Sequence, residues 1–373
     1  MIYKTIEELT TVVTGGTPST SKAEYWENGN IPWLQSGCCQ NCDVNQADKF
    51  ISQSGYDNSS TQVMPVNTVM IALTGATAGK VGYLNIEACG NQSITGVFPC
   101  EELNPRFLFY FLISQRRKIL VDCVGGAQAH ISQGYVKKIK VPVYSKNLQE
   151  RIVNIMNICS KNIKHYEMIL KEYDELVKAR FVEMFGDPII NPYGFPVKKI
   201  DEVAVLNKGI TYSPDDISKE GIIVLRSGNI KGNAFDLEDI VRISKKISND
   251  KLVNENDILM CNRNGSVNLV GKVAKIPKLE EKMTFGTFMT IVRSEIFEYL
   301  FVFFQMNAFR EQIKFQTAVA INQISLPLLA SVKVPIPTNE LIKEFADFVE
   351  QVDKSRFDIK KSITEIEREV VYD

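Results

Sequence analysis

The sequence contains few of the residues that build catalytic or metal sites. Only two of its 373 residues are histidines, His130 and His165, and its start, MIYKTIEELT, lacks the basic-then-apolar layout of a secretory signal. No run of about twenty apolar residues occurs. The eight cysteines are scattered apart from Cys38, Cys39 and Cys42, and no second Cys-x-x-Cys pair completes a zinc set. We therefore expect a cytoplasmic protein with reduced thiols and no bound metal.

Motifs for enzymatic work on DNA are also missing. The segment from Gly75 to Val81 resembles a P-loop, but it is one residue short and lacks the Ser or Thr that would hold magnesium. Asn191-Pro192-Tyr193 resembles the catalytic tetrapeptide of amino-methyltransferases without its second proline, and no Gly-rich turn for a methyl donor precedes it. No Asp with Glu-x-Lys stands in a setting that would hold a nuclease metal. The sequence thus predicts a non-catalytic chain, although the Gly-rich turn ending in Lys80 could still hold a DNA phosphate.

Charge is distributed unevenly along the chain, although its net value is only −1. Residues 1–147 carry 12 Lys+Arg against 11 Asp+Glu, and residues 188–337 carry 19 against 16. The two remaining stretches together carry 12 against 17, so the acidity lies there. A mild basic excess permits nucleic-acid binding by the first two regions but is also typical of an ordinary solvated surface.

The two halves of the chain match in order at a nearly constant offset, which indicates an internal duplication. Small changes of offset between matched blocks are what loops tolerate. The matches pair Ile6, Glu8, Leu9, Val12 and Gly15 with Ile200, Glu202, Val203, Leu206 and Gly209; Leu34, Ser36 and Gly37 with Leu225, Ser227 and Gly228; Gly79-Lys80-Val81 with Gly271-Lys272-Val273; and Ile131-Ser132, Val141-Pro142 and Leu148 with Ile324-Ser325, Val334-Pro335 and Leu341.

Each copy is expected to hold a mixed globular part followed by a long helix. Short apolar runs such as 69–73 and 257–260, bounded by Gly, Asn and Pro, predict strands. The aromatic runs 107–112 and 298–304 predict helices of the core, because they are too apolar for an exposed base-stacking groove.

A long apolar stripe predicts a pair of helices. Apolar or aromatic residues recur every three or four positions from 148 to 184, and again from 341 to 370. A stripe of this length needs a partner helix, and the other copy supplies one, so the two helices should be antiparallel. Gly186-Asp187-Pro188 should end the first helix.

With these features assembled, the chain resembles the specificity subunits of type I restriction-modification systems over its whole length. Copy two departs from the first motif, having Gly209-Ile-Thr-Tyr-Ser213-Pro214 in its place, so individual base contacts cannot be transferred from the family. The resemblance rests on Gly15-Gly16-Thr17-Pro18-Ser19, Tyr25-Trp26, Gly29-Asn30-Ile31-Pro32-Trp33, Gly79-Lys80-Val81-Gly82, the Ile-Ser to Val-Pro segment of each copy, Phe185-Gly186-Asp187-Pro188 and Asn191-Pro192.

The resemblance implies an α+β fold in which two tandem α/β target recognition domains are separated by two long, antiparallel, coiled-coil-like helices. The domains would be residues 1–147 and 188–337, and the helical regions 148–187 and 338–373. Each domain would read one half of a bipartite target on double-stranded DNA, while the helices set the spacer and dock two methyltransferase subunits, which restriction subunits join. S-adenosylmethionine, ATP and magnesium would belong to these partners, with no cofactor in this chain.

Helix length and loop chemistry make these expectations concrete. A helix from 148 to 184 would span about 55 Å, or roughly 16 base pairs of DNA. Arg reads guanine and Asn or Gln reads adenine by paired hydrogen bonds, although Asn in loops often serves only turn geometry. We expect DNA contacts from Lys80, Asn91, Gln92, Gln128 and His130 in copy one and from Arg263, Asn264, Asn268, Lys272 and Gln323 in copy two.

Two other functions remain compatible with the sequence. The chain could be the recognition piece of a fused restriction-methylation enzyme, in which case it should bind S-adenosylmethionine. It could also be a helical scaffold without sequence preference, which would bind specific and random duplexes equally.

Overall fold

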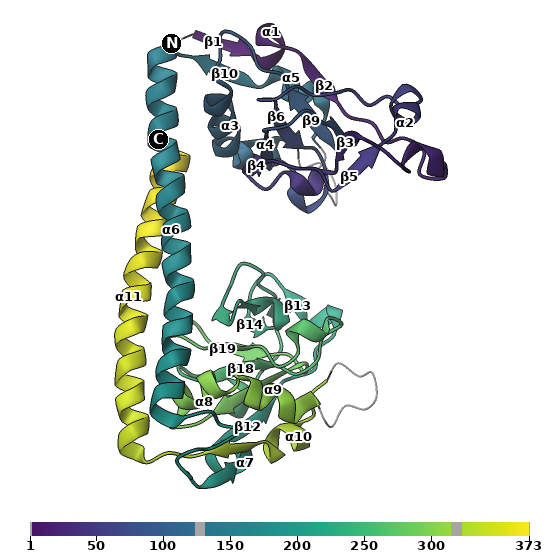
Figure 1. Ribbon diagram of the computed structural model, residues 1–373. Helices are drawn as coiled ribbons and strands as arrows, with labels where there is room; N and C mark the ends of the chain where they lie inside the picture. The colour runs from purple at the N-terminus through teal and green to yellow at the C-terminus, as the bar shows by residue number, and fades with distance from the viewer. Residues whose placement is uncertain (1, 124–130, 315–322, 373) are drawn as a thin grey trace. The chain divides into compact units, whose positions relative to one another are not determined.

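The computed structural model describes residues 2–123, 131–314 and 323–372. The chain divides into two compact units, the first of Met1–Glu167 with Lys360–Asp373 and the second of Met168–Ile359 (Figure 1). Helices α6 (Lys146–Phe185) and α11 (Asn339–Tyr372) each contribute to both units. In the described part of the chain, no helix is long and apolar enough to cross a membrane.

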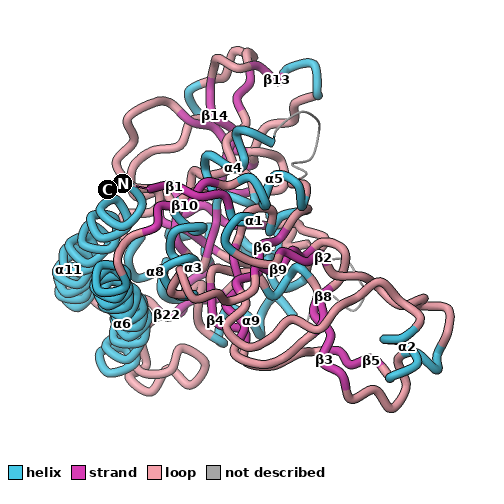
Figure 2. Tube along the Cα trace, turned by 90° about the horizontal axis from the view of Figure 1, so that it is seen from above, coloured by secondary structure: helices cyan, strands magenta, loops and turns pink. Residues whose placement is uncertain are grey.

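The first unit is built on a five-stranded sheet of order β2-β9-β6-β7-β4. A smaller sheet, β5-β3-β8, lies beside it together with α2 (Figure 2). The elements before α6 are β1 (Ile2–Thr5), α1 (Ile6–Leu9), β2 (Val12–Thr14), β3 (Ile31–Leu34), β4 (Cys42–Val44), β5 (Lys49–Ile51), α2 (Gln53–Asp57), β6 (Val69–Ala72), β7 (Val81–Leu84), β8 (Cys89–Gly90), β9 (Ile94–Val97), α3 (Pro105–Ser114), α4 (Arg116–Cys123), α5 (Gln133–Lys138) and β10 (Lys140–Val143).

The second unit repeats this sheet as β12-β21-β18-β19. Its elements before α11 are β11 (Val197–Lys199), α7 (Ile200–Val203), β12 (Val205–Lys208), β13 (Ile217–Ser218), β14 (Ile222–Leu225), β15 (Ile230–Lys231), β16 (Ala234–Phe235), β17 (Arg242–Ile243), β18 (Ile258–Cys261), β19 (Val273–Lys275), β20 (Met283–Phe285), β21 (Met289–Arg293), α8 (Phe297–Phe303), α9 (Asn307–Lys314), α10 (Leu326–Ser331) and β22 (Lys333–Pro335). Short 3₁₀ turns η1 (Ala23–Tyr25), η2 (Ser36–Cys38), η3 (Gly75–Thr77), η4 (Pro214–Asp216), η5 (Ser227–Asn229), η6 (Asn249–Lys251) and η7 (Val267–Leu269) interrupt the loops of both units.

The matching strand orders confirm the predicted duplication. Strands β2, β9, β6 and β7 correspond in order to β12, β21, β18 and β19, and both sets pair antiparallel. The parallel pair β3–β8 corresponds to β14–β20, and β1–β10 corresponds to β11–β22. The first unit alone adds a fifth strand to the main sheet, β4, which runs parallel to β7.

Both faces of the central strands are buried, which is why these runs read as continuous apolar stretches. In β6, Val69 and Ile71 face one core cluster, whereas Met70 and Ala72 face another, as the two-residue period of a strand requires. The aromatic runs predicted for the core are buried as expected. The buried side chains of α3 are Phe107, Leu108, Phe109, Tyr110 and Leu112, and those of α8 are Tyr299, Leu300, Val302 and Phe303.

Helices α6 and α11 are antiparallel where they meet in the second unit, as predicted. Arg356 of α11 donates to Asp174 at 2.6 Å, and Arg180, nearer the end of α6, donates to Glu344 at 2.9 Å, nearer the start of α11. These two stretches lie side by side in both views (Figure 1 and Figure 2). Helix α6 ends at Phe185, where Gly186 adopts a left-handed φ of 73°.

One part of the predicted stripe is not covered. Ile155 is 59% exposed, although its spacing along α6 places it in line with buried positions further on. Here α6 packs on the first unit through a different set of side chains. Val153 joins the core, and the fully buried Gln149 accepts from the Asn104 backbone N–H at 2.6 Å and donates to the carbonyl oxygens of Glu102 and Tyr144. The prediction that the partner helix covers the whole apolar stripe of α6 was therefore wrong at Ile155.

Candidate nucleic-acid interface

Two corresponding loops follow the central strands β6 and β18. We call residues 73–79 loop 1 and residues 262–271 loop 2. Loop 1 is closed where the Ala72 N–H donates to the Lys80 carbonyl at 2.9 Å and the Gly79 N–H donates to the Ala72 carbonyl at 2.9 Å. In loop 2 the Cys261 N–H donates to the Lys272 carbonyl at 2.9 Å and the Gly271 N–H to the Cys261 carbonyl at 2.7 Å. The structural counterpart of Lys80 is therefore Lys272.

Each loop ends on a glycine that the fold requires. Gly79 and Gly271 have φ values of 73° and 77°, in the left-handed region that side chains disfavour. An arginine from a following helix fastens the same point in each copy: Arg116 Nε donates to the Ala78 carbonyl at 3.3 Å, and Arg310 donates to the Val270 carbonyl at 2.6 Å. Burial lowers the pKa of Arg310 from its ordinary value. These arginines hold the loops, which leaves other residues to contact a ligand.

Two further segments meet each loop at its first residue. In copy one the Leu73 N–H donates to the Ser93 carbonyl at 2.8 Å, and the Leu73 carbonyl accepts from Ile131 at 2.9 Å. In copy two Asn262 takes the place of Leu73, donating to the Phe288 carbonyl at 2.8 Å and accepting from Ile324 at 2.8 Å. Each copy thus brings three chain segments together at one end of its main sheet. The side chains of the loops differ between the two copies.

The residues predicted for copy one are partly engaged within the protein. Lys80 is half-buried, and its ammonium donates to Gln40 Oε1 at 2.7 Å. Asn91 Oδ1 accepts from the Ser93 N–H at 3.1 Å, which is a turn-forming role. Gln92 is exposed and accepts from the Thr17 hydroxyl. The predicted contacts Gln128 and His130 lie outside the described residues.

The residues predicted for copy two lie closer together. Arg263 is exposed and forms a β-bridge with Gln323, also exposed. Asn264 Nδ2 donates to Ser227 Oγ at 3.0 Å. Asn268 is exposed and Lys272 is half-buried. Their roles in DNA binding stay predictions.

Free positive charge distinguishes some of these side chains from other basic residues nearby. Arg226, Arg242 and Arg293 are paired with Asp239, Glu281 and Asp257, respectively, at 2.6 Å. Within the described ranges, neither Arg263 nor Lys272 makes an ion pair. An unpaired cation costs less to transfer to a phosphate or a base edge than one that must first leave a carboxylate.

Four further side chains lie at these loops that were not expected as DNA contacts: Thr17, Gln40, Ser227 and Phe288. Thr17 belongs to a motif of the family resemblance and Ser227 to a matched block of the duplication, but only the fold brings them and Gln40 to the loops. Phe288 follows Gly286-Thr287 between two buried strands, and only the structure shows that its side chain is 52% exposed. The Arg263 guanidinium lies over its ring at 5.3 Å from the centroid.

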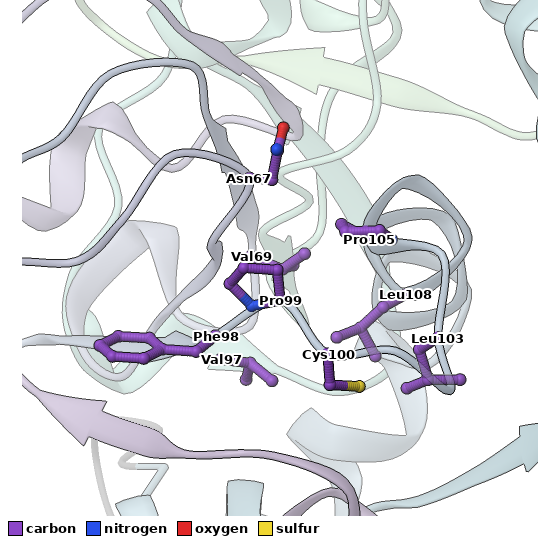
Figure 3. A pocket seen from close by; sticks show the side chains of 9 residues that line it. All are labelled: Asn67, Val69, Val97, Phe98, Pro99, Cys100, Leu103, Pro105 and Leu108. Atoms are coloured by element: carbon purple, nitrogen blue, oxygen red, sulfur yellow. The ribbon is translucent and has the colours of Figure 1, made fainter.

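Two hollows elsewhere in the described part of the chain do not suit a nucleotide or a methyl donor. One, between the sheet of the first unit and α3, has apolar lining apart from Asn67 and is too narrow to admit a water molecule (Figure 3). A more open groove in the second unit is lined by the acidic Asp201, Glu202 and Glu295, which disfavour phosphate. Its Arg293 already binds Asp257 through two hydrogen bonds of 2.7 and 2.6 Å. Among the described residues, no three His, Cys, Asp or Glu side chains gather as a metal site.

Comparison with known proteins agrees with this architecture. A model of the family described as type I restriction modification DNA specificity domain matches the chain twice, at residues 2–172 and 192–368. The EcoR124I/EcoR124II type I restriction enzyme specificity subunit of Escherichia coli is 31% identical over 160 residues, covering 42% of this chain and 40% of that protein. The MjaIX specificity subunit of Methanocaldococcus jannaschii is 20% identical over 387 residues, covering 96% of this chain and 88% of its own length.

A solved structure supports the same fold. It comes from work described as the structural basis underlying complex assembly and conformational transition of the type I R-M system. The superposition has a TM-score of 0.56 at 12% identity and covers 99% of this chain and 95% of that one. With the family model matching both copies of the duplication, the chain belongs to the type I restriction-modification DNA specificity family.

Proposed function

We propose that this chain is the DNA-sequence-reading, non-catalytic subunit of a type I restriction-modification complex. The observation that carries the proposal is the double match to the DNA specificity domain, once in each copy of the duplication. The corresponding loops support it, because they share one backbone frame but differ in their side chains at the first two positions. Reading two different half-sites requires different base-contacting side chains, which a common backbone frame can present in each copy.

Residues 1–147 and 188–337 are the two target recognition domains in this proposal, and each reads one half of a bipartite target. Base contacts come from the exposed loop residues, foremost Arg263, Asn268 and Gln323 in copy two and Gln92 in copy one. Lys80 and Lys272 sit at the closing end of each loop as point charges suited to phosphate. Asn91 and Asn264 support turn and loop geometry in the free protein through their hydrogen bonds.

The helical regions 148–187 and 338–373 act as spacer and as docking surface for two methyltransferase subunits. Helix α6 is continuous for 40 residues, about 60 Å of helix, so it can set a fixed distance between elements at its ends. Restriction subunits complete the complex. Chemistry that needs S-adenosylmethionine, ATP or magnesium belongs to the partners in this proposal.

The test uses the chain reconstituted with its methyltransferase subunits and, separately, the purified chain alone. Mapping methylated adenines in the source genome first gives the target sequence. The complex should then bind that duplex in the presence of excess random duplex, and the chain alone should neither methylate nor cleave it. Equal competition by random duplex would support a scaffold instead, and single-turnover methylation by the chain alone, free of co-purified methyltransferase, would make it an enzyme.

A further inference from the structure

The two copies place different chemical pairs at one equivalent position. In each copy, the first residue of the loop donates its backbone N–H to the carbonyl oxygen of a residue in a neighbouring turn. The side chain of the second loop residue contacts the side chain of that same turn residue. In copy one these residues are Thr74 and Ser93, and the Thr74 hydroxyl donates to Ser93 Oγ at 2.9 Å. In copy two they are Arg263 and Phe288, and the guanidinium lies over the ring at 5.3 Å. A neutral hydroxyl pair in one copy thus corresponds to a cation–aromatic pair in the other.

The copy-two pair is open to a ligand. Arg263 is exposed and Phe288 is 52% exposed, so a ligand can reach both side chains. Among the described residues no carboxylate pairs with Arg263. With one face of the guanidinium against the ring, the N–H donors along its edge remain available, and the ring limits the tilt of that edge.

The backbone on both sides of Arg263 is fastened. The preceding Asn262 is buried, and its Nδ2 donates to the Thr290 hydroxyl. The following Asn264 donates to Ser227 Oγ at 3.0 Å, and Arg263 itself is bridged to Gln323. In copy one the residue equivalent to Asn262 is Leu73, so this polar support is particular to copy two. A side chain on an anchored backbone loses less freedom when it binds, which favours a specific contact over a loose electrostatic one.

We infer that Arg263, positioned by Phe288, reads a guanine in the half-site of copy two, and that the Thr74–Ser93 pair makes no corresponding guanine requirement in the half-site of copy one. This inference rests on the proposed function. A guanidinium edge donates two parallel hydrogen bonds to guanine O6 and N7, a pairing that no other base offers in the major groove. Hydroxyls accept from or donate to either base, so they discriminate little. The Arg263–Phe288 pair is therefore the point at which the two readers diverge in base preference.

The test measures binding of the reconstituted complex with methyltransferase subunits to duplexes that carry single base-pair changes throughout both half-sites. Arg263→Ala should lose about 5- to 150-fold discrimination at one guanine of one half-site, leaving the other positions unchanged. Phe288→Leu should lose about two- to fivefold at the same guanine, and Phe288→Tyr should keep the discrimination. Replacing that guanine by 7-deazaguanine removes N7 and should weaken the wild-type complex but not Arg263→Ala.

Controls separate the inference from the fold and from the proposed function. Phe50, 44% exposed on β5 of the first unit, gives a matched variant, Phe50→Leu, that should leave this guanine unaffected. Thermal unfolding of every variant should match the wild type, because Arg263 and Phe288 are surface residues. If the wild type discriminates but Arg263→Ala keeps full discrimination at every guanine, the inference is wrong and the proposed function stands. Loss of a guanine preference in Thr74→Ala would also overturn it, and a wild-type complex that binds all duplexes equally would remove the proposed function itself.

Discussion

Replacing Phe181 by alanine should remove a central contact between α6, α8 and α11 in the second unit. Phe181 is fully buried. Its ring centroid lies 4.9 Å from Phe185, 4.9 Å from Tyr299 and 5.6 Å from Phe345. These neighbours come from both long helices and from the globular part, so one ring joins three elements that the chain brings together from far apart in sequence.

The expected loss follows from the size of the cavity that alanine leaves. Truncating a buried phenylalanine to alanine costs about 3–5 kcal/mol, and the rigid aromatic neighbours here limit how far the site can collapse. With a urea dependence of about 2–3 kcal/mol per molar for a unit of this size, the unfolding midpoint of the second unit should fall by about 1–2.5 M.

The assay is urea unfolding of the full chain, with amide hydrogen exchange along α8 reporting the second unit separately. Phe357→Ala is the matched control, because Phe357 is on α11 but is 68% exposed, and its loss should stay within about 0.5 kcal/mol. Equal midpoints for the two variants would refute the reasoning that Phe181 joins the helix pair to the globular part.

Further predictions concern charge and length. Lys275→Ala leaves the largely buried Glu298 without the ammonium that now lies 2.7 Å away, so the second unit should lose about 1–3 kcal/mol and Glu298→Gln in the same chain should recover part of it. Burial raises the pKa of Glu298, and losing the ammonium raises it further. The loss measured by urea unfolding should therefore be largest above the pKa of Glu298 in the variant and shrink as the pH falls to the wild-type pKa; a loss independent of pH would contradict the role of Glu298. Lys80→Ala should weaken binding of the reconstituted complex to all duplexes alike and lower its salt slope by about one, and a change in base preference would show that Lys80 reads sequence. Deleting one heptad within 155–175, with a matching deletion in α11, should shorten the target spacer by about 3 base pairs in methylome sequencing and leave both half-sites intact. An unchanged spacer in an active complex would mean that the helices do not set it.

Much of the fold could be predicted because it depends on patterns that are local in sequence. The aromatic runs became the buried helices α3 and α8, and Gly186 ended α6 in a left-handed conformation. The duplication predicted a repeated unit, and the strand orders of the two sheets match. The exposed Ile155 shows the limit of this reasoning, since periodicity identifies an apolar face but not which parts of it a partner covers.

The candidate site was harder to predict because the two loops differ in length. Ala72 corresponds to Cys261, whereas Gly79 corresponds to Gly271, so loop 2 is longer and a constant offset cannot align its residues. Only the backbone hydrogen bonds show that Arg263 in copy two holds the position equivalent to Thr74 in copy one. Phe288 was missed because an aromatic residue between buried strands is usually core, and its exposure depends on contacts distant in sequence.

The central claim is that the two copies read separate half-sites, and a domain exchange tests it most directly. Residues 1–147 would be replaced by the matching segment of a family member with a different target, and the resulting complex would be expressed with its methyltransferase subunits and its methylated adenines mapped across a genome. The account predicts that one half of the bipartite target changes to that of the donor and the other half stays as it was. A change in both halves, or in neither while the complex remains active, would contradict it.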